Sequence, residues 1–120
     1  LTYLFISHDL SVVRHMSNRI AVMYLGKVVE TSTTETLFKA PQHPYTKALL
    51  SAIPVTNLQL RRERIRLTGD IPSPIHLPTG CAFHTRCPFV MDRCRSEQPV
   101  LQAVEKTDTH LVACHLVEAK

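Results

Sequence analysis

The chain has 120 residues, enough for one small domain or two modest ones, and 44% of them are hydrophobic, so part of it can build a core. Its net charge of +4 is mild and does not by itself indicate nucleic-acid binding. No apolar run approaches the roughly 18 residues that a membrane-spanning helix needs, and the first residues lack the pattern of a secretory signal peptide.

The first residues predict a buried strand followed by a helix. Residues 2–6, in "LTYLFI", are apolar and β-prone, and "SHD" at 7–9 interrupts them. Asp9 can cap a helix whose apolar stripe begins at Leu10. Because a natural protein rarely starts inside a central strand, we interpret the chain as the C-terminal part of something longer.

A hairpin and a short helix are predicted next. The run "RIAVMYLGKVVET" (19–31) has Gly26 in its middle, where a tight turn often needs positive φ. The run is apolar on both faces, which predicts a hairpin covered on both sides. In "STTE" (32–35) we expect a capping box, with Ser32 capping a helix that stops before Pro41.

A further helix is predicted in "HPYTKALLSAIP" (43–54). Pro44 suits the first helical turn, because its missing N–H would be unpaired there anyway. We therefore expect His43 to act as an imperfect cap and Tyr45 to pack against the core. Pro54 should end the helix.

The remaining residues predict little regular structure. Three prolines make residues 69–80 extended and turn-like, and "HLVACHLV" (110–117) predicts a short final strand. The most basic stretch contains Arg61, Arg62, Arg64 and Arg66. We interpret it as a solvated face, because no aromatic residues interleave with the arginines as in a nucleic-acid surface.

His8 is the candidate catalytic residue. It lies where the first predicted strand ends and the helix begins, and ligands of open α/β sheets bind outside the carboxyl ends of the strands. A neutral imidazole there could hydrogen-bond a phosphate oxygen or the attacking water. A loop histidine without such a role is the alternative that the residues leave open.

Several motifs in order resemble one family. The segment "YLFISHDLSVVRHMSNRIAVMYLGKVVE" resembles the region after the Walker B strand of ATP-binding cassette ATPases. "TETLFKAPQHPYTKALL" resembles the subfamily that energises oligopeptide and dipeptide importers, known for a His-Pro-Tyr element (here His43, Pro44 and Tyr45), and "GDIPSPIHLPTGCAFHTRCPF" matches its C-terminal extension. The resemblance implies an α/β fold: the end of a P-loop nucleotide-binding domain over 1–53, then a small irregular Cys-rich extension over 54–120.

The resemblance also implies a function. His8 would be the switch-loop histidine that contacts the ATP γ-phosphate across a closed dimer. ATP with Mg²⁺ would serve the full-length subunit, and the partners would be a second ATPase subunit and the transporter's membrane subunits, at the cytoplasmic face of the membrane. Peptide would be met only indirectly, and no nucleic acid is expected. Since the chain lacks Walker A, Walker B and Leu-Ser-Gly-Gly-Gln elements, we expect it to be inactive alone.

The four cysteines are the candidate metal ligands. They are Cys81, Cys87, Cys94 and Cys114, with the spacing C-x5-C-x6-C-x19-C. This spacing has neither the tight pairs typical of zinc sites nor a common ferredoxin pattern. Cytosolic thiols are normally reduced, which disfavours disulfides, so a metal that cross-links a segment with little core is favoured.

The resemblance implies a [4Fe-4S] cluster on these four cysteines, since some similar ATPases carry one in this extension. Zinc, with help from His84, His110 or His115, is less favoured, and disulfides or free core cysteines stay open. We expect a structural staple more than a redox sensor, because the sequence supplies no electron partner.

Two other interpretations stay open. One is a free-standing Cys-rich module that binds zinc and nucleic acid through Arg61 to Arg66, in which the buried-strand opening and the His-Asp loop have no role. The other is a purely structural dimerisation fragment, which would need no His8.

Overall fold

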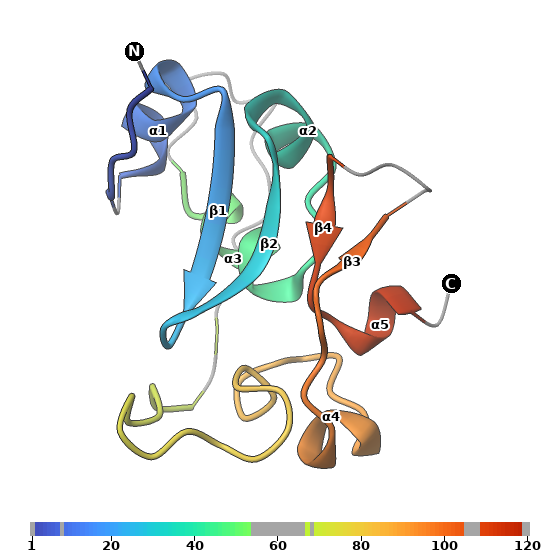
Figure 1. Cartoon of the computed structure of the whole chain (residues 1–120). Coiled ribbons are helices and arrows are strands. Elements are labelled where there is room, and N and C mark those ends of the chain that lie inside the picture. Colours follow the sequence, from blue (N-terminus) through green and yellow to red (C-terminus); the bar gives the residue numbers. More distant parts are fainter. Residues whose placement is uncertain (1, 8, 54–66, 68, 105–108, 119–120) are drawn as a thin grey trace.

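The computed structural model describes residues 2–7, 9–53, 67, 69–104 and 109–118. Its framework is an antiparallel sheet in the order β1-β2-β4-β3, with short helices around it (Figure 1). None of the described helices has the length and apolar character to cross a membrane. The predicted roles of His8 and of the arginines at 61–66 fall outside the described residues.

The predicted hairpin is confirmed. Strand β1 (Arg19–Tyr24) pairs with β2 (Lys27–Thr33), and the turn between them has φ of 50° at Leu25 and 80° at Gly26. Buried and exposed residues alternate along β1, so one face packs into the core while Met23 and its neighbours on the other face are exposed. The expectation that both faces are covered is therefore wrong for β1.

A segment far along the chain extends this hairpin into a sheet. Strand β4 (Leu111–Val112) pairs with β2 so that Val112 lies opposite Glu30, and β3 (Gln102–Ala103) pairs with β4. The predicted final strand is right only at its start, because α5 (His115–Glu118) follows it at once. The sheet therefore contains residues from both predicted halves, and the division at 53/54 stays a prediction.

Helix α1 (Leu10–Met16) begins as predicted. The Asp9 carboxylate accepts hydrogen bonds from the N–H groups of Ser11 and Val12, at 3.0 and 3.4 Å. These contacts satisfy two amides of the first turn that have no partner within the helix.

Helix α2 (Thr34–Lys39) begins one residue later than the predicted capping box implies. Thr33 is its cap, and the Thr33 Oγ1 atom accepts the N–H of Thr36 at 3.3 Å. Ser32 is buried within β2, so its side chain is turned into the core and is not placed to cap the helix.

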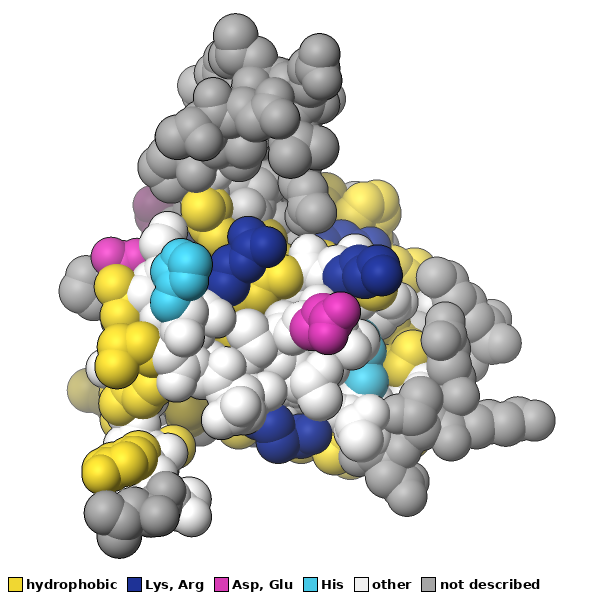
Figure 2. Space-filling view, turned by 90° about the horizontal axis from the view of Figure 1, so that it is seen from above, with side chains coloured by type: hydrophobic (Ala, Val, Ile, Leu, Met, Phe, Trp, Pro, Cys, Tyr) yellow, Lys and Arg dark blue, Asp and Glu magenta, His cyan; other side chains and the backbone are white. Residues whose placement is uncertain are grey.

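The predicted strand at residues 2–6 does not form among the described residues. Leu4 and Ile6 are 95% and 96% exposed, and residues 2–7 have neither helical nor strand structure. A strand needs a neighbour to satisfy its backbone N–H and C=O groups, and no described strand lies beside this segment. In Figure 2, exposed hydrophobic side chains lie along one edge of the visible face, whereas Lys and Arg side chains are scattered over it.

The core joins the hairpin to the later loop. Phe83 is almost fully buried, and its ring meets that of Tyr24 edge to face at 5.2 Å. Tyr45 packs on both rings, which confirms its expected role. The described part of 69–80 is extended and turn-like, as predicted. Through these contacts the loop after residue 80 packs against the buried face of the β1–β2 hairpin and against the start of α3 (Pro44–Ser51).

Candidate metal centre

The four cysteines, which the sequence predicts as ligands, line one pocket. The pocket is formed by the loop after residue 80, by α4 (Asp92–Ser96), by α5 and by the start of α3. It is lined by Cys81, Cys87, Cys94 and Cys114, with His43, His84, His115, Pro44, Phe83, Phe89 and Leu116. All four cysteines are free thiols. The fold thus brings thiols from three separate segments to one pocket.

Gly80 allows the first of these approaches. Its φ is +71°, and a Cβ atom at this position would lie 2.4 Å from the carbonyl O of Cys94 and 2.8 Å from the carbonyl C of Arg95. The next residue donates its N–H to that same carbonyl, from Cys81 N to Cys94 O at 2.8 Å. Glycine therefore lets the loop cross the end of α4 closely enough to place Cys81 beside Cys94.

A tight turn follows Cys81 and positions the next residues of the loop. The His84 N–H donates to the carbonyl of Cys81 at 3.1 Å, and the Arg86 N–H donates to that of Phe83 at 3.0 Å. These bonds hold Phe83 in the core, where its ring also lines the pocket together with Cys81 and Cys87.

Cys114 reaches the pocket from the sheet. The N–H of the preceding residue, Ala113, donates to the carbonyl of Val29 at 2.8 Å, which continues the attachment of β4 to β2. After it, the ring of His115 contacts the carbonyl O of Glu97 through Nε2 at 2.8 Å. Cys114 is therefore held between two fixed points, one on the sheet and one just after α4.

Burial makes three of these thiols hard to ionise. It raises the pKa of Cys81, Cys87 and Cys114, and for Cys87 the pKa rises to about 11. The neighbouring cysteines add to each rise, because a second thiolate in the same pocket would repel the first. A bound cation would reverse this preference.

Backbone amides oppose the effect of burial. The N–H of Phe89 donates to Cys87 Sγ at 3.4 Å, and that of Met91 donates to Cys94 Sγ at 3.5 Å. The backbone amides of Phe83 and His84 lower the pKa of Cys81. Those of Leu116 and Val117 lower the pKa of Cys114. A backbone amide that donates to a sulfur stabilises its thiolate form.

The donor set fits a metal group in its chemistry, but the sulfurs do not converge on one point. Within the described part of the chain, no three His, Cys, Asp or Glu side chains are grouped closely enough to hold a metal ion. The pocket has a volume of about 10 Å³, roughly the space of one water molecule. A tetrahedral zinc ion, with Zn–S bonds of about 2.3 Å, would need tighter convergence.

His43 forms part of the pocket wall and starts α3. Its Nδ1 atom accepts the N–H of Tyr45 at 3.0 Å, and Pro44 occupies the first helical position, so the predicted cap is confirmed. Burial lowers the pKa of His43 to about 4. The ring is therefore neutral at physiological pH.

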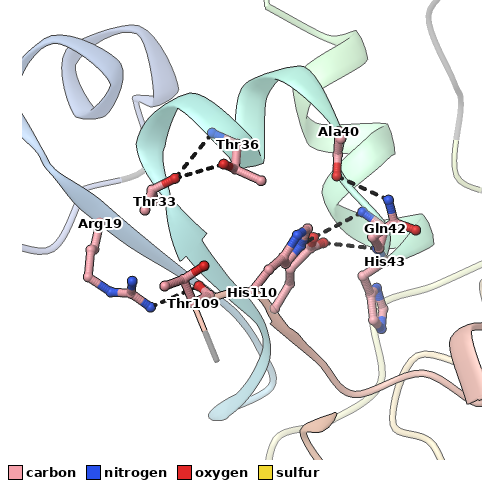
Figure 3. Close-up of polar contacts among 9 residues, drawn as sticks. Arg19, Thr33, Thr36, Ala40, Gln42, His43, Thr109 and His110 are labelled. Atoms are coloured by element: carbon pink, nitrogen blue, oxygen red, sulfur yellow. Dashed lines mark hydrogen bonds and ion pairs between the residues drawn. The ribbon is translucent and has the colours of Figure 1, made fainter. Parts of the chain in front are cut away.

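Glu30, which the sequence did not identify, holds the backbone of His43 in the pocket wall. Its carboxylate is fully buried, Oε1 accepts the N–H of His43 at 2.9 Å, and Oε2 accepts that of Gln42 at 2.9 Å (Figure 3). His110 Nε2 lies 2.5 Å from the same Oε2. The signal that could have revealed Glu30 is a carboxylate inside an apolar strand. Of the histidines considered as zinc ligands, His84 and His115 line the pocket, whereas His110 contacts Glu30.

Comparison with known proteins agrees with the motifs. The family model described as "Oligopeptide/dipeptide transporter, C-terminal region" matches residues 29–94. The chain is 55% identical to the dipeptide transport ATP-binding protein DppF of Haemophilus influenzae, over 98% of this chain and 36% of that protein. It is 54% identical to the oligopeptide transport ATP-binding protein AppF of Bacillus subtilis, over 97% and 35%.

These matches define the class as a small mixed helix-and-strand region from the C-terminal part of an ATP-binding cassette ATPase. More particularly, the chain belongs to the oligopeptide/dipeptide transporter C-terminal region family, and the resemblance drawn from the motifs is confirmed. The chain spans about a third of the length of the curated relatives it matches.

Proposed function

We propose that this chain is the C-terminal region of the ATP-hydrolysing subunit that powers oligopeptide or dipeptide import. The family match over residues 29–94 carries the proposal, and the names of the relatives support it. In this role the full-length subunit binds ATP and Mg²⁺, pairs with a second ATPase subunit and docks on the transporter's membrane subunits at the cytoplasmic face. It meets peptide only indirectly.

Within this role, His8 is the switch histidine that contacts the γ-phosphate. The support is its place in the sequence, directly before Asp9, the residue that caps α1. Removing a group that stabilises the transition-state charge costs about two to three orders of magnitude in turnover. In the full-length subunit, we therefore expect His8→Ala to lower ATP hydrolysis at least about 100-fold with unchanged circular dichroism.

His15→Ala is the matched control, because His15 is an exposed histidine at the end of α1. It should leave ATP hydrolysis unchanged. If His8→Ala hydrolyses ATP at the wild-type rate, the catalytic role of His8 is wrong, whereas the family membership is unaffected.

The Cys-rich extension is proposed to hold a metal centre that cross-links the loop after residue 80, α4 and the segment after β4. The support is the placement of all four thiols around one pocket, with backbone amides that donate to the sulfurs of Cys87 and Cys94. The resemblance to importer ATPases favours a [4Fe-4S] cluster over zinc, and the pocket, which has the space of one water molecule, would have to widen to hold it. When bound, the cluster would cross-link these three segments. A second possible role of the same extension is a contact between two ATPase subunits.

The test is metal content and visible absorbance of the intact subunit purified without oxygen. We expect about four irons per chain and a broad charge-transfer band, both lost in Cys94→Ser and retained in Thr85→Ser, an exposed position on the same loop. One zinc per chain would favour the zinc-module interpretation. No metal, with four titratable thiols and an intact fold, would contradict the proposed centre.

A further inference from the structure

The two residues that flank His8 are bonded to each other, and one of them is also bonded to helix α1. The N–H of Asp9 donates to Ser7 Oγ at 3.0 Å, so this hydrogen bond spans the residue between them. The Asp9 Oδ1 atom accepts the N–H groups of Ser11 and Val12, at 3.0 and 3.4 Å. Asp9 therefore connects the segment before His8 with the first turn of the helix after it.

Contacts at its two ends fix α1 more than burial does. All residues of α1 are described, and none of them is buried. At its C-terminal end, Thr34 Oγ1 donates to the carbonyl of Ser17 at 2.7 Å, and the Thr34 N–H donates to that of Asn18 at 3.0 Å. At its N-terminal end, the cap is Asp9. Helix α1 is thus a short link between the residue after His8 and the end of the hairpin, where α2 begins.

We infer that Asp9 is a positioning residue for ATP hydrolysis: its carboxylate fixes the start of α1, and this holds His8 in the place from which it contacts the γ-phosphate. The inference rests on the proposed role of His8 as the switch histidine. Asp9 needs no contact with the nucleotide, because it acts through the neighbour to which it is covalently joined. A misplacement of about 1 Å can cost roughly 100-fold in rate. A loosened helix start should therefore slow the reaction.

Two substitutions separate the cap from the charge. Asp9→Ala removes the acceptor of both amides. Asp9→Asn keeps an acceptor oxygen, and asparagine caps helices about as well as aspartate, but it removes the negative charge next to His8 in the chain. If the cap is what positions His8, asparagine should keep the activity that alanine loses.

Gly26→Ala is the matched control for a loss of stability. A residue other than glycine is strained at the positive φ of Gly26, and the removal of a helix cap weakens a fold by a similar amount. The turn that contains Gly26 lies at the end of the hairpin away from α1 (Figure 1), and an added Cβ atom there meets nothing within 4 Å. This control therefore destabilises the chain without touching α1 or its contacts.

The assay is ATP hydrolysis by the full-length subunit. We expect Asp9→Ala to lower kcat at least about tenfold with KM for ATP unchanged, because a positioning group acts on the reaction step and not on nucleotide binding. Asp9→Asn and Gly26→Ala should both keep kcat within about twofold of the wild type. In a His8→Ala background, Asp9→Ala should cause no further loss, because the group that it positions is gone.

Several results would overturn the inference. Wild-type kcat in Asp9→Ala, with His8→Ala slow, would do so and leave the role of His8 intact. Equal losses in Asp9→Asn and Asp9→Ala would show that the charge is required and not the cap. A further loss in the double variant would show that Asp9 acts without His8, and an equal loss in Gly26→Ala would show that instability alone slows the enzyme. Wild-type kcat in His8→Ala would overturn the role of His8 and the inference with it.

A second readout needs no ATP turnover. Amide hydrogen exchange of the full-length subunit reports whether the first turn of α1 is held. The N–H groups of Ser11 and Val12 should exchange faster in Asp9→Ala than in the wild type, and at the wild-type rate in Asp9→Asn. Unchanged exchange in Asp9→Ala would show that the carboxylate does not hold the helix start, and would contradict the inference directly.

Discussion

Glu30 Oε2 and His110 Nε2 lie 2.5 Å apart, although their residues are 80 positions apart in the chain. Both side chains are buried, one on β2 and the other just before β4. The pair therefore joins the N-terminal hairpin to the C-terminal strand at the point where Glu30 also holds the start of α3.

The first prediction concerns this carboxylate. Glu30→Ala would leave the imidazole of His110 and the N–H groups of Gln42 and His43 buried without their acceptor. Breaking such a buried pair costs about 3–5 kcal/mol in the free energy of unfolding, which urea denaturation would measure. Glu35→Ala, on an exposed position of α2, should change it by no more than about 0.5 kcal/mol. A similar small change in Glu30→Ala would show that the buried carboxylate is not a stabilising link.

The second prediction concerns the crossing at Gly80. Gly26 and Gly80 both have positive φ, but a Cβ atom at Gly26 meets nothing within 4 Å, whereas at Gly80 it strikes the backbone of α4. Gly26→Ala should therefore cost only the conformational penalty, about 1–2 kcal/mol. Gly80→Ala should cost a further 1–3 kcal/mol or so for the overlap and lower the metal content. Equal unfolding free energies for the two variants would contradict the close approach.

The third prediction is a pH dependence of stability. The pKa of His43 falls from the ordinary histidine value of 6.5, which applies to the unfolded chain, to about 4 in the folded protein. Between pH 4 and pH 6.5 the unfolded chain therefore binds a proton that the folded chain does not. The contribution of His43 to the free energy of unfolding is fully present above pH 6.5 and is lost as the pH falls toward 4. The loss is on the order of 3 kcal/mol.

His43→Asn isolates this contribution, because it keeps a cap and removes the titrating ring. The difference in unfolding free energy between wild type and variant, measured by denaturation of metal-free protein at each pH, should shrink as the pH falls from 6.5 to 4. A difference that is constant across this range would show that His43 titrates normally in the folded state.

The fourth prediction concerns Cys87. With its pKa raised from 9.0 to about 11, the thiolate fraction at pH 8 is roughly 100-fold below that of an ordinary cysteine. In metal-free protein, alkylation of Cys87 followed by peptide mass spectrometry should therefore rise about tenfold per pH unit from 7 to 10. The same peptide in denaturant should react faster and level off near pH 9. Levelling near pH 9 in the folded protein would contradict the raised pKa.

Local patterns predicted those parts of the fold that local forces determine. The turn at Gly26, the cap at Asp9 and the helix start at Pro44 depend on neighbours within a few residues, and all three were right. The strand at residues 2–6 was predicted from its apolar character alone. That character requires a partner to cover it, and the described residues provide none.

The sequence identified the thiols of the candidate site but not the residues that form its walls. Cysteine is chemically distinctive, so the four thiols could be named from composition. The contact of Glu30 with His110 joins two positions that no local pattern relates. Likewise, "HPY" predicted a cap at His43, but only the packing of the loop after residue 80 shows that the capped ring faces a pocket.

The pairing of β2 with β4 also bears on the order in which the molecule assembles. The hairpin of β1 and β2 closes over a two-residue turn and can form early, whereas β4 must return across most of the chain before it pairs. Cys114 follows directly on β4, so the fourth thiol arrives only with this last step. The proposed metal centre, which needs all four thiols, could therefore be completed only late in the maturation of the subunit. A chain that stalls before β4 pairs would have three of the thiols in place without the fourth.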